Sequence, residues 1–247
     1  MFGGTFNPVH LGHVGAARDV MHRFALDCIY FIPSAHPPHK PDAALAAAPD
    51  RYEMVSLGLA DSAAMCPSDV EIRRNGPSYS VDTVTFYKRR LGRSVRLFFL
   101  LGVDAFLEID TWKSYETILE EAAFVVMSRP PHARTENDLY ALTAPYIKAT
   151  LSQAYVYEAA GRVWTHASRP PIFLAEVVPV EIASSQLRDK IRRGESAEQW
   201  LSPAVVQYIK QKGLYRWTRL QTPCLISLLR PLWGGKRKTL WCWTCAG

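Results

Sequence analysis

Residues 3–13 read Gly3-Gly4-Thr5-Phe6-Asn7-Pro8-Val9-His10-Leu11-Gly12-His13, and this stretch decides how the chain folds. The two glycines let backbone N–H groups approach a phosphate closely, and the N-terminus of the helix expected next favours negative charge. His10 and His13 are three residues apart, so a helix directs both side chains from one face into the same space. The stretch matches neither of the common phosphate loops, G-x-G-x-x-G and G-x-x-x-x-G-K-[ST]. It predicts a phosphate site with two histidine donors at a turn that leads into a helix.

Short apolar runs alternate with helical patterns along the rest of the chain. The runs predicted as strands are Cys28–Pro33, Pro67–Ile72, Val95–Gly102, Phe124–Ser128 and Phe173–Val180. The stretches predicted as helices are Leu11–Ala25, Asp50–Asp61, Ser80–Leu91, Tyr115–Ala122, Ser184–Arg193 and Pro203–Lys212. This alternation predicts a parallel sheet covered by helices on both faces. Right-handed crossovers then give a Rossmann-like, doubly wound α/β fold with a small helical C-terminal part, which binds ligands beyond the carboxyl ends of its strands.

Three segments fit this pattern poorly. Residues 34–49 are rich in Pro and Ala and are predicted as a mobile loop. Within residues 131–172, a turn at residues 158–162 separates two short apolar runs, which predicts a small hairpin. Only Met1 and Phe2 precede the first glycine, so the first strand is unusually short. Either the natural start lies upstream or this strand is poorly anchored.

Composition and charge argue against several classes of protein. The 247 residues suit one α/β domain, no run of about 18 apolar residues indicates a membrane span, and no signal peptide is expected. Five scattered cysteines are too few for a disulfide scaffold, so a reducing, cytoplasmic location is expected. The net charge is +6, but residues 217–247 hold five basic residues and no acid, which leaves the rest at +1. The body is therefore not expected to bind nucleic acid through its charge.

Further motifs follow the opening stretch in a fixed order. They are Pro37-Pro38-His39-Lys40, Gly76–Thr83, Gly102–Phe106 with Thr111-Trp112, Ile182–Arg188, and Lys212–Tyr215. As a set they resemble the bacterial nicotinate-nucleotide adenylyltransferases of the nucleotidyltransferase superfamily. The resemblance covers residues 1–216 and implies a catalytic domain of that extent. It leaves residues 217–247 as an extension, which is expected to be disordered.

The resemblance implies an activity and a cofactor. Such an enzyme transfers the adenylyl group of ATP to nicotinate mononucleotide, giving nicotinate adenine dinucleotide (deamido-NAD) and pyrophosphate in NAD biosynthesis. The acceptor phosphate is already ionised and attacks the α-phosphorus directly, so catalysis consists of positioning and charge stabilisation. Mg²⁺ is expected to arrive with ATP, held mainly by phosphates and water, and no acidic metal cage is expected. A homo-oligomer is left open.

The resemblance also implies roles for individual residues. The implied catalytic residues are His10, His13, Lys40 and Arg188. The residues implied to bind ATP are Gly3, Gly4, Thr5, Phe6, His10, His13, Lys40, Gly102, Asp104, Ser184, Ser185 and Arg188. For nicotinate mononucleotide, the resemblance implies that Trp112 stacks on the pyridine ring and that backbone N–H groups of Ser80 and Lys113 hold the carboxylate. No residue is implied as a metal ligand.

Several of these residues also have ordinary structural explanations. Ser184 or Ser185 is a candidate N-cap for the late helix, with Arg188 one turn on and able to reach the same anion. A lysine in a proline-rich loop is normally solvated. Trp112 is of a type that commonly lies in the core, and Asp104 is a candidate N-cap.

Other functions stay open at this stage. The opening stretch also suits adenylyltransferases that act on nicotinamide mononucleotide or phosphopantetheine, and cytidylyltransferases; Trp112, residues 78–83 and the chain length favour the nicotinate enzyme. The basic, Trp-containing residues 217–247 are also compatible with a module that binds nucleic acid or an anionic membrane. Cys242 and Cys245 make half a zinc site at best. An inactive relative is the third alternative, supported by the short first strand.

Overall fold

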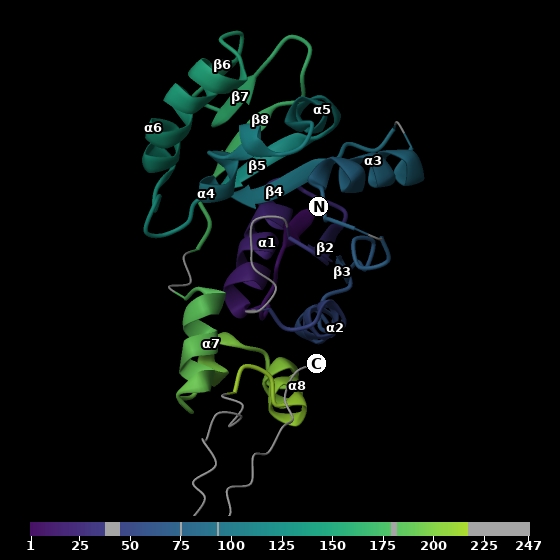
Figure 1. Cartoon of the computed structure of the whole chain (residues 1–247). Helices are drawn as coiled ribbons and strands as arrows, with labels where there is room; N and C mark the ends of the chain where they lie inside the picture. The colour runs from purple at the N-terminus through teal and green to yellow at the C-terminus, as the bar shows by residue number, and fades with distance from the viewer. Residues whose placement is uncertain (38–44, 75, 93, 179–181, 217–247) are drawn as a thin grey trace, which may run out of the picture. The chain divides into compact units, whose positions relative to one another are not determined.

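The structure, a computed structural model, describes residues 1–37, 45–74, 76–92, 94–178 and 182–216. These residues belong to one compact unit, Met1–Arg216. Its centre is a sheet with the strand order β3-β2-β1-β4-β5-β8-β7-β6 (Figure 1). The strands are β1 (Phe2–Gly4), β2 (Ile29–Pro33), β3 (Met65–Pro67), β4 (Phe98–Gly102), β5 (Ala123–Met127), β6 (Val156–Glu158), β7 (Val163–Thr165) and β8 (Ile172–Ala175).

The sheet is doubly wound around β1, as the sequence predicts. β2 and β3 extend it on one side of β1, while β4, β5 and β8 extend it on the other, and all of these strands are parallel. In such a sheet a crevice opens beyond the carboxyl ends of the strands where the strand order reverses. Here the reversal lies between β1 and β4. The residues that follow β1 therefore lie where this kind of sheet binds ligands.

One edge of the sheet is antiparallel, in addition to the predicted parallel strands. β6 and β7 form an antiparallel hairpin, the one predicted around residues 158–162, and β7 pairs antiparallel with β8. The predicted strand Pro67–Ile72 is wrong. β3 ends at Pro67, and the next residues turn, so that the Asp69 carbonyl accepts from the Arg73 N–H at 2.9 Å. β8 ends at Ala175, so the strand predicted to reach residue 180 is too long.

Helices fill the connections between these strands. They are α1 (Leu11–Arg23), α2 (Ala48–Gly58), α3 (Ser80–Leu91), α4 (Val103–Phe106), α5 (Tyr115–Glu121), α6 (Glu136–Tyr146), α7 (Ser184–Arg192) and α8 (Pro203–Lys212). The six predicted helices are confirmed, with ends that differ by at most three residues. α4 and α6 are additional to the prediction, and α6 continues into a π-helical turn over Ile147–Leu151.

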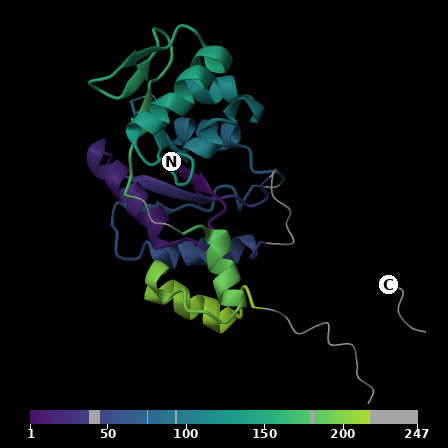
Figure 2. The ribbon, with the colours of Figure 1, turned by 90° about the vertical axis from the view of Figure 1, so that its left-hand side faces the viewer.

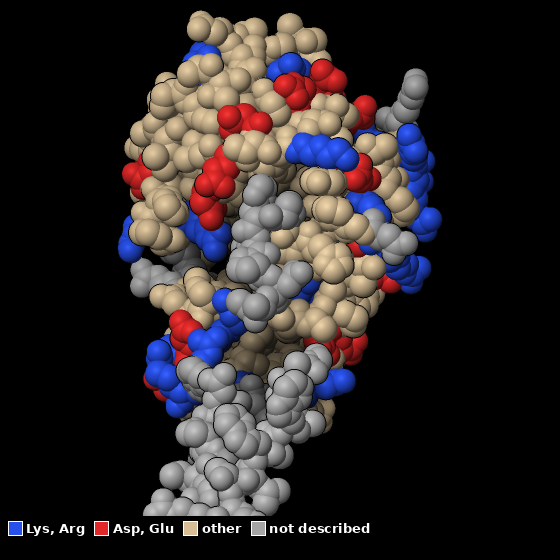
Figure 3. All heavy atoms as spheres, viewed as in Figure 1, with Lys and Arg blue, Asp and Glu red and all other residues tan. Residues whose placement is uncertain are grey.

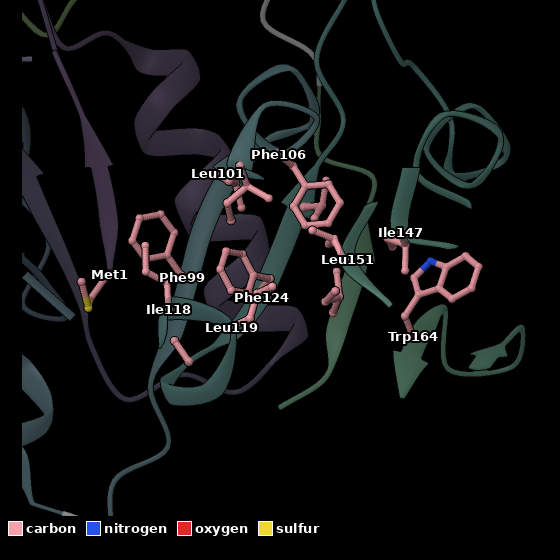
Figure 4. Packing of buried hydrophobic residues seen from close by; sticks show 14 of the residues in the cluster. Met1, Phe99, Leu101, Phe106, Ile118, Leu119, Phe124, Ile147, Leu151 and Trp164 are labelled. Carbon is pink, nitrogen blue, oxygen red and sulfur yellow. The ribbon is translucent and has the colours of Figure 1, made fainter. Parts of the chain in front are cut away.

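Helices cover both faces of the sheet because strand side chains point alternately to the two sides. Phe99, Leu101 and Phe124 lie in a cluster with residues of α3, α5 and α6, and Figure 4 shows the Phe99 and Phe124 rings side by side. Leu100 and Val125 lie in a second cluster with residues of α1, α2, α7 and α8. The predicted covering of both faces is therefore confirmed.

α7 and α8 form the small helical C-terminal part. Both ribbon views place α8 beside α2 (Figures 1 and 2). The Tyr208 hydroxyl of α8 donates to Asp50 Oδ1 of α2 at 2.7 Å. The C-terminal helices thus pack on the helix that follows β2.

β1 is short but is hydrogen-bonded on both sides. Phe2 pairs with Phe31 of β2 and Leu100 of β4. The Met1 amino group donates to the Phe98 carbonyl at 2.7 Å, and the Leu100 N–H donates to the Met1 carbonyl at 2.9 Å. The expectation of a poorly anchored first strand is wrong, because a strand in the middle of a sheet is held by two neighbours.

The surface matches the near-neutral charge of the body. On the face shown in Figure 3, basic side chains gather over α3 and are interspersed with acidic ones elsewhere. Within the described ranges, no helix has the length and apolar character needed to cross a bilayer.

Candidate active site

Residues 5–9, called the opening loop below, connect β1 to α1. Gly4 precedes the loop, and a Cβ on Gly4 would lie 3.2 Å from the Phe6 ring, so this position favours glycine. Phe6 has a φ of 46° and is buried, with its ring centroid 5.5 Å from those of both Phe2 and Phe31. The Phe6 side chain therefore holds the loop from the core side, and only its backbone faces the loop's exposed side.

The two histidines meet at the start of α1. His10 is the N-cap residue and His13 lies in the first turn, and their ring centroids are 3.7 Å apart. The His10 N–H donates to His13 Nδ1 at 3.2 Å. Because Nδ1 accepts, a neutral His13 ring carries its proton on Nε2 and can donate it from there. The structure thus brings both predicted histidines to one place and fixes the tautomer of His13.

His10 is held in its neutral form. Its side chain is buried, and this burial, together with the nearby Arg129 guanidinium, lowers the pKa of His10 to about 4. His10 Nδ1 is buried and has no hydrogen-bond partner among the described residues. A buried polar atom without a partner is uncommon in a native fold and indicates a place where a ligand or water completes the bonding.

Helix α7 reaches back to the opening loop. Ser184 Oγ donates to the Pro8 carbonyl at 2.9 Å, and Arg188 Nη1 donates to the Asn7 carbonyl at 2.9 Å. Arg188 Nε is buried and has no partner among the described residues. The late motif and the opening loop, far apart in the sequence, therefore form one site.

The N-cap assigned to this helix from the sequence is wrong. Ala183 is the N-cap residue and Ser184 is the first residue of α7, while the Ser185 side chain is exposed. The reason is local: Gln186 Oε1 accepts from the Ala183 N–H at 2.8 Å, which starts the helix one residue earlier. The Ser184 hydroxyl is then free to bind the loop instead of its own helix.

The end of β4 places a carboxylate next to a glycine. A Cβ on Gly102 would lie 2.5 Å from Asp104 Oδ1, so a larger residue there would displace the Asp104 carboxylate. Asp104 Oδ2 accepts from Arg129 Nη1 at 2.8 Å, while Oδ1 is buried without a partner among the described residues. The N-cap of the following helix is Gly102, so the interpretation of Asp104 as an N-cap is wrong.

The residues predicted for the acceptor also come together. Ser80 is the first residue of α3, preceded by Tyr79, and Lys113 Nζ lies 4.4 Å from the centre of the Tyr79 ring. Trp112 is half-buried, with its ring edge-on to Phe99 at a centroid distance of 5.9 Å. Trp112 therefore meets the core on one side and keeps the rest of its surface accessible.

Some predictions lie outside the described residues. They include Lys40 and the whole extension, residues 217–247. In the described ranges, no group of three or more His, Cys, Asp or Glu side chains is placed to hold a metal ion.

The sequence did not predict the residues that fix the opening loop by hydrogen bonds to Thr5 and Asn7. Asn7 Oδ1 accepts from the Tyr215 hydroxyl at 2.8 Å and from the Ala46 N–H at 3.0 Å. Arg51 is buried and donates to the Thr5 carbonyl. The motif Lys212–Tyr215 signalled that the end of the body matters, whereas a single arginine within a helical pattern gave no signal.

Comparisons with known proteins agree with this geometry. The profile of a family described as "Cytidylyltransferase-like" matches residues 1–190. The nicotinate-nucleotide adenylyltransferase of Desulfatibacillum aliphaticivorans is 36% identical over 216 residues, which cover 87% of this chain and 98% of that protein. The corresponding protein of Geotalea uraniireducens is 37% identical over 215 residues, 87% of this chain and 96% of that protein. The chain belongs to the nicotinate-nucleotide adenylyltransferase family.

A solved structure has the same fold as this member of the nicotinate-nucleotide adenylyltransferase family. It is the nicotinic acid mononucleotide adenylyltransferase of Plasmodium falciparum, complexed with NaAD, which superposes with a TM-score of 0.61 at 17% identity. The match covers 87% of this chain and 95% of that one. At this identity the likeness shows the fold alone.

Proposed function

We propose that the protein transfers the adenylyl group of ATP to nicotinate mononucleotide, giving nicotinate adenine dinucleotide and pyrophosphate in NAD biosynthesis. The observation that carries the proposal is the convergence of neutral His10, His13 and Arg188 on the opening loop after the central strand. These groups are donors, and donors suit the oxygens of a triphosphate.

In this mechanism the acceptor phosphate attacks the α-phosphorus in line and pyrophosphate leaves. His13 Nε2–H and Arg188 Nε–H donate to phosphate oxygens and stabilise the charge that develops on them. The N-terminus of α1 lies at the same place and contributes the partial positive charge of the helix dipole. No side chain forms a covalent bond with the substrate, because the acceptor phosphate is already a nucleophile.

The two substrates are assigned to different sets of residues around this centre. The adenosine part lies toward Gly102 and Asp104, whose partnerless Oδ1 is available to accept a hydrogen bond. The nicotinate ring lies against Trp112, with the N–H of Ser80 at the start of α3 and that of Lys113 directed to its carboxylate. ATP and nicotinate mononucleotide are thus the proposed partners of the site.

Mg²⁺ enters with ATP in this proposal. The side chains directed to the phosphates are histidines and an arginine, whose nitrogen atoms are poor ligands for Mg²⁺, so phosphates and water hold the cation. Bound there, Mg²⁺ supplies charge neutralisation on the pyrophosphate leaving group.

We infer a cytoplasmic location from the cysteines. Cys28, the residue before β2, and Cys66 of β3 are free thiols whose sulfur atoms lie 3.8 Å apart. Two such close thiols remain reduced in a reducing compartment.

The donor nucleotide is the first point to test, because the matching profile is described as cytidylyltransferase-like. Purified protein is incubated with nicotinate mononucleotide, Mg²⁺ and either ATP or CTP, and the products are identified by mass spectrometry. The proposal expects nicotinate adenine dinucleotide from ATP and little product from CTP. A product formed from CTP alone contradicts it.

A further inference from the structure

Arg51 of α2 is among the most deeply buried side chains of the protein, with 1% of its surface exposed. A buried guanidinium is tolerated only when its donors are well paired. Nε donates to the Ala46 carbonyl at 2.9 Å, Nη1 to the Thr5 carbonyl at 2.8 Å and Nη2 to the Ala35 carbonyl at 3.1 Å. One planar group thus binds the main chain of three separate segments.

The contact with the Thr5 carbonyl orients the opening loop. A trans peptide is planar, with its C=O and N–H pointing in opposite directions. When Arg51 binds the Thr5 carbonyl, the N–H of Phe6 must therefore point away from the buried guanidinium. The contact with the Ala35 carbonyl likewise fixes the orientation of the peptide after Ala35, in the segment that follows β2.

The segment after β2 is in turn bound to the start of α3. Ser78 Oγ accepts from the Ala35 N–H at 2.9 Å and from the His36 N–H at 3.3 Å, and the Ser78 N–H donates to the His36 carbonyl at 3.1 Å. Ser78 lies two residues before Ser80, which begins α3. Arg51 and Ser78 therefore link the loop proposed to bind the triphosphate to the helix start proposed to bind nicotinate.

We propose that Arg51 is a positioning residue that sets the spacing between the ATP-binding loop and the nicotinate-binding start of α3. It contacts no substrate and acts through the carbonyls of Thr5 and Ala35. The inference rests on the proposed function, since that function assigns the two substrates to these two segments. In-line attack depends on their spacing, and a shift of about 1 Å costs on the order of 10²-fold in rate.

The test compares Arg51→Lys with a control that removes a different side-chain contact of α2. Lysine keeps the charge but offers a single ammonium on a flexible stem, so it cannot bind three separated carbonyls. The control is Tyr208→Phe, which removes the hydrogen bond to Asp50 and leaves both loops untouched. Pyrophosphate release gives kcat and the KM values for ATP and nicotinate mononucleotide. Amide hydrogen exchange reports on residues 2–9 and 34–37.

For Arg51→Lys we expect kcat to fall roughly 10- to 100-fold, with both KM values within about threefold of wild type. Exchange should become faster in residues 2–9 and 34–37. Tyr208→Phe should leave kcat and both exchange rates unchanged. A folded Arg51→Lys protein with wild-type kcat and wild-type exchange overturns the proposal.

Ser78→Ala provides a second test that leaves the buried charge in place. It removes the acceptor of the Ala35 and His36 N–H groups. It should lower kcat about fivefold with KM values retained, and unchanged kcat and exchange overturn the proposal even if Arg51→Lys does not fold. If the wild-type protein releases no pyrophosphate, the proposed function is rejected. The hydrogen-exchange data then still show whether Arg51 holds residues 2–9 and 34–37 in place.

Discussion

At the scale of single residues, the proposed reaction depends on His10 and His13 at the start of α1. His13 accepts the His10 N–H at Nδ1 and is left with one ring donor, Nε2. We expect His13→Ala to lower kcat by roughly 10²-fold, because it removes a donor aimed at developing charge. His22→Ala, an exposed position in the last turn of the same helix, is the matched control. Near-normal turnover of a folded His13→Ala protein would remove His13 from the mechanism.

The depressed pKa of His10 also predicts a pH dependence of stability. The pKa of the folded residue is about 4, below the ordinary value of 6.5, because burial disfavours the charged ring. As the pH falls, the unfolded chain takes up the proton first, so stability present above pH 6.5 is lost between 6.5 and 4. From pH 8 to pH 5 this loss is about 2 kcal/mol.

Urea unfolding at pH 8 and pH 5 measures this loss. His10→Asn keeps a residue that suits an N-cap and removes the titrating ring. The variant should lose less stability than wild type over this interval. Equal losses in the two proteins would show that His10 is not buried as the structure has it.

The sequence made the histidines and Arg188 predictable, because they belong to motifs with fixed spacing. It did not make Arg51 predictable. Arg51 donates to three main-chain carbonyls, which leave no mark on the sequence, and the Thr5 carbonyl lies 46 residues away along the chain. Whether an arginine is buried depends on packing, and a helical pattern alone normally places it in solvent.

At the scale of elements, α7 and the opening loop work as one unit. Arg188→Ala should lower kcat/KM for ATP by about 10- to 100-fold, since it removes the hydrogen bond to the Asn7 carbonyl and a charged donor to phosphate. Arg188→Lys should be intermediate. Arg192→Ala, one turn on, is the control, because Arg192 pairs with Asp189 of its own helix. Unchanged kinetics with ATP would make Arg188 an ordinary helix residue.

The helices were more predictable than the strands. α3 and α8 end where apolar periodicity stops, and both match their predicted bounds. α6 escaped prediction because Pro145 lies inside it and suggests a break, although Thr135 and Asp138 form a capping box at its start. The hairpin of β6 and β7 was predicted, but its antiparallel pairing with β8 was not, because strands of three or four residues are too short to show a period.

At the scale of the whole molecule, the last residues of the body, Leu214 and Tyr215, pack next to the opening loop near its N-terminus. The Tyr215 hydroxyl donates to Asn7 Oδ1 behind the opening loop, and Leu214 and Tyr215 pack against the second core cluster. We expect a chain ending at Arg216 to retain kcat within about twofold of the full chain. A chain ending at Gly213 lacks Tyr215 and should be less stable by roughly 1–3 kcal/mol, the range for a lost buried hydrogen bond.

Thermal unfolding and pyrophosphate release of the two shortened chains measure these effects. If the chain ending at Arg216 loses activity, residues 217–247 belong to the catalytic unit and the domain boundary proposed here is wrong. Binding of RNA or anionic vesicles by the full chain alone would assign those residues a separate role.

The most direct measurement is pyrophosphate release by the purified full chain with MgATP and either nicotinate or nicotinamide mononucleotide. We expect rapid release with the nicotinate form and slow release with the nicotinamide form, because the N–H groups of Ser80 and Lys113 are assigned to a carboxylate. Release with the nicotinamide form alone, or with neither from folded protein, would contradict it.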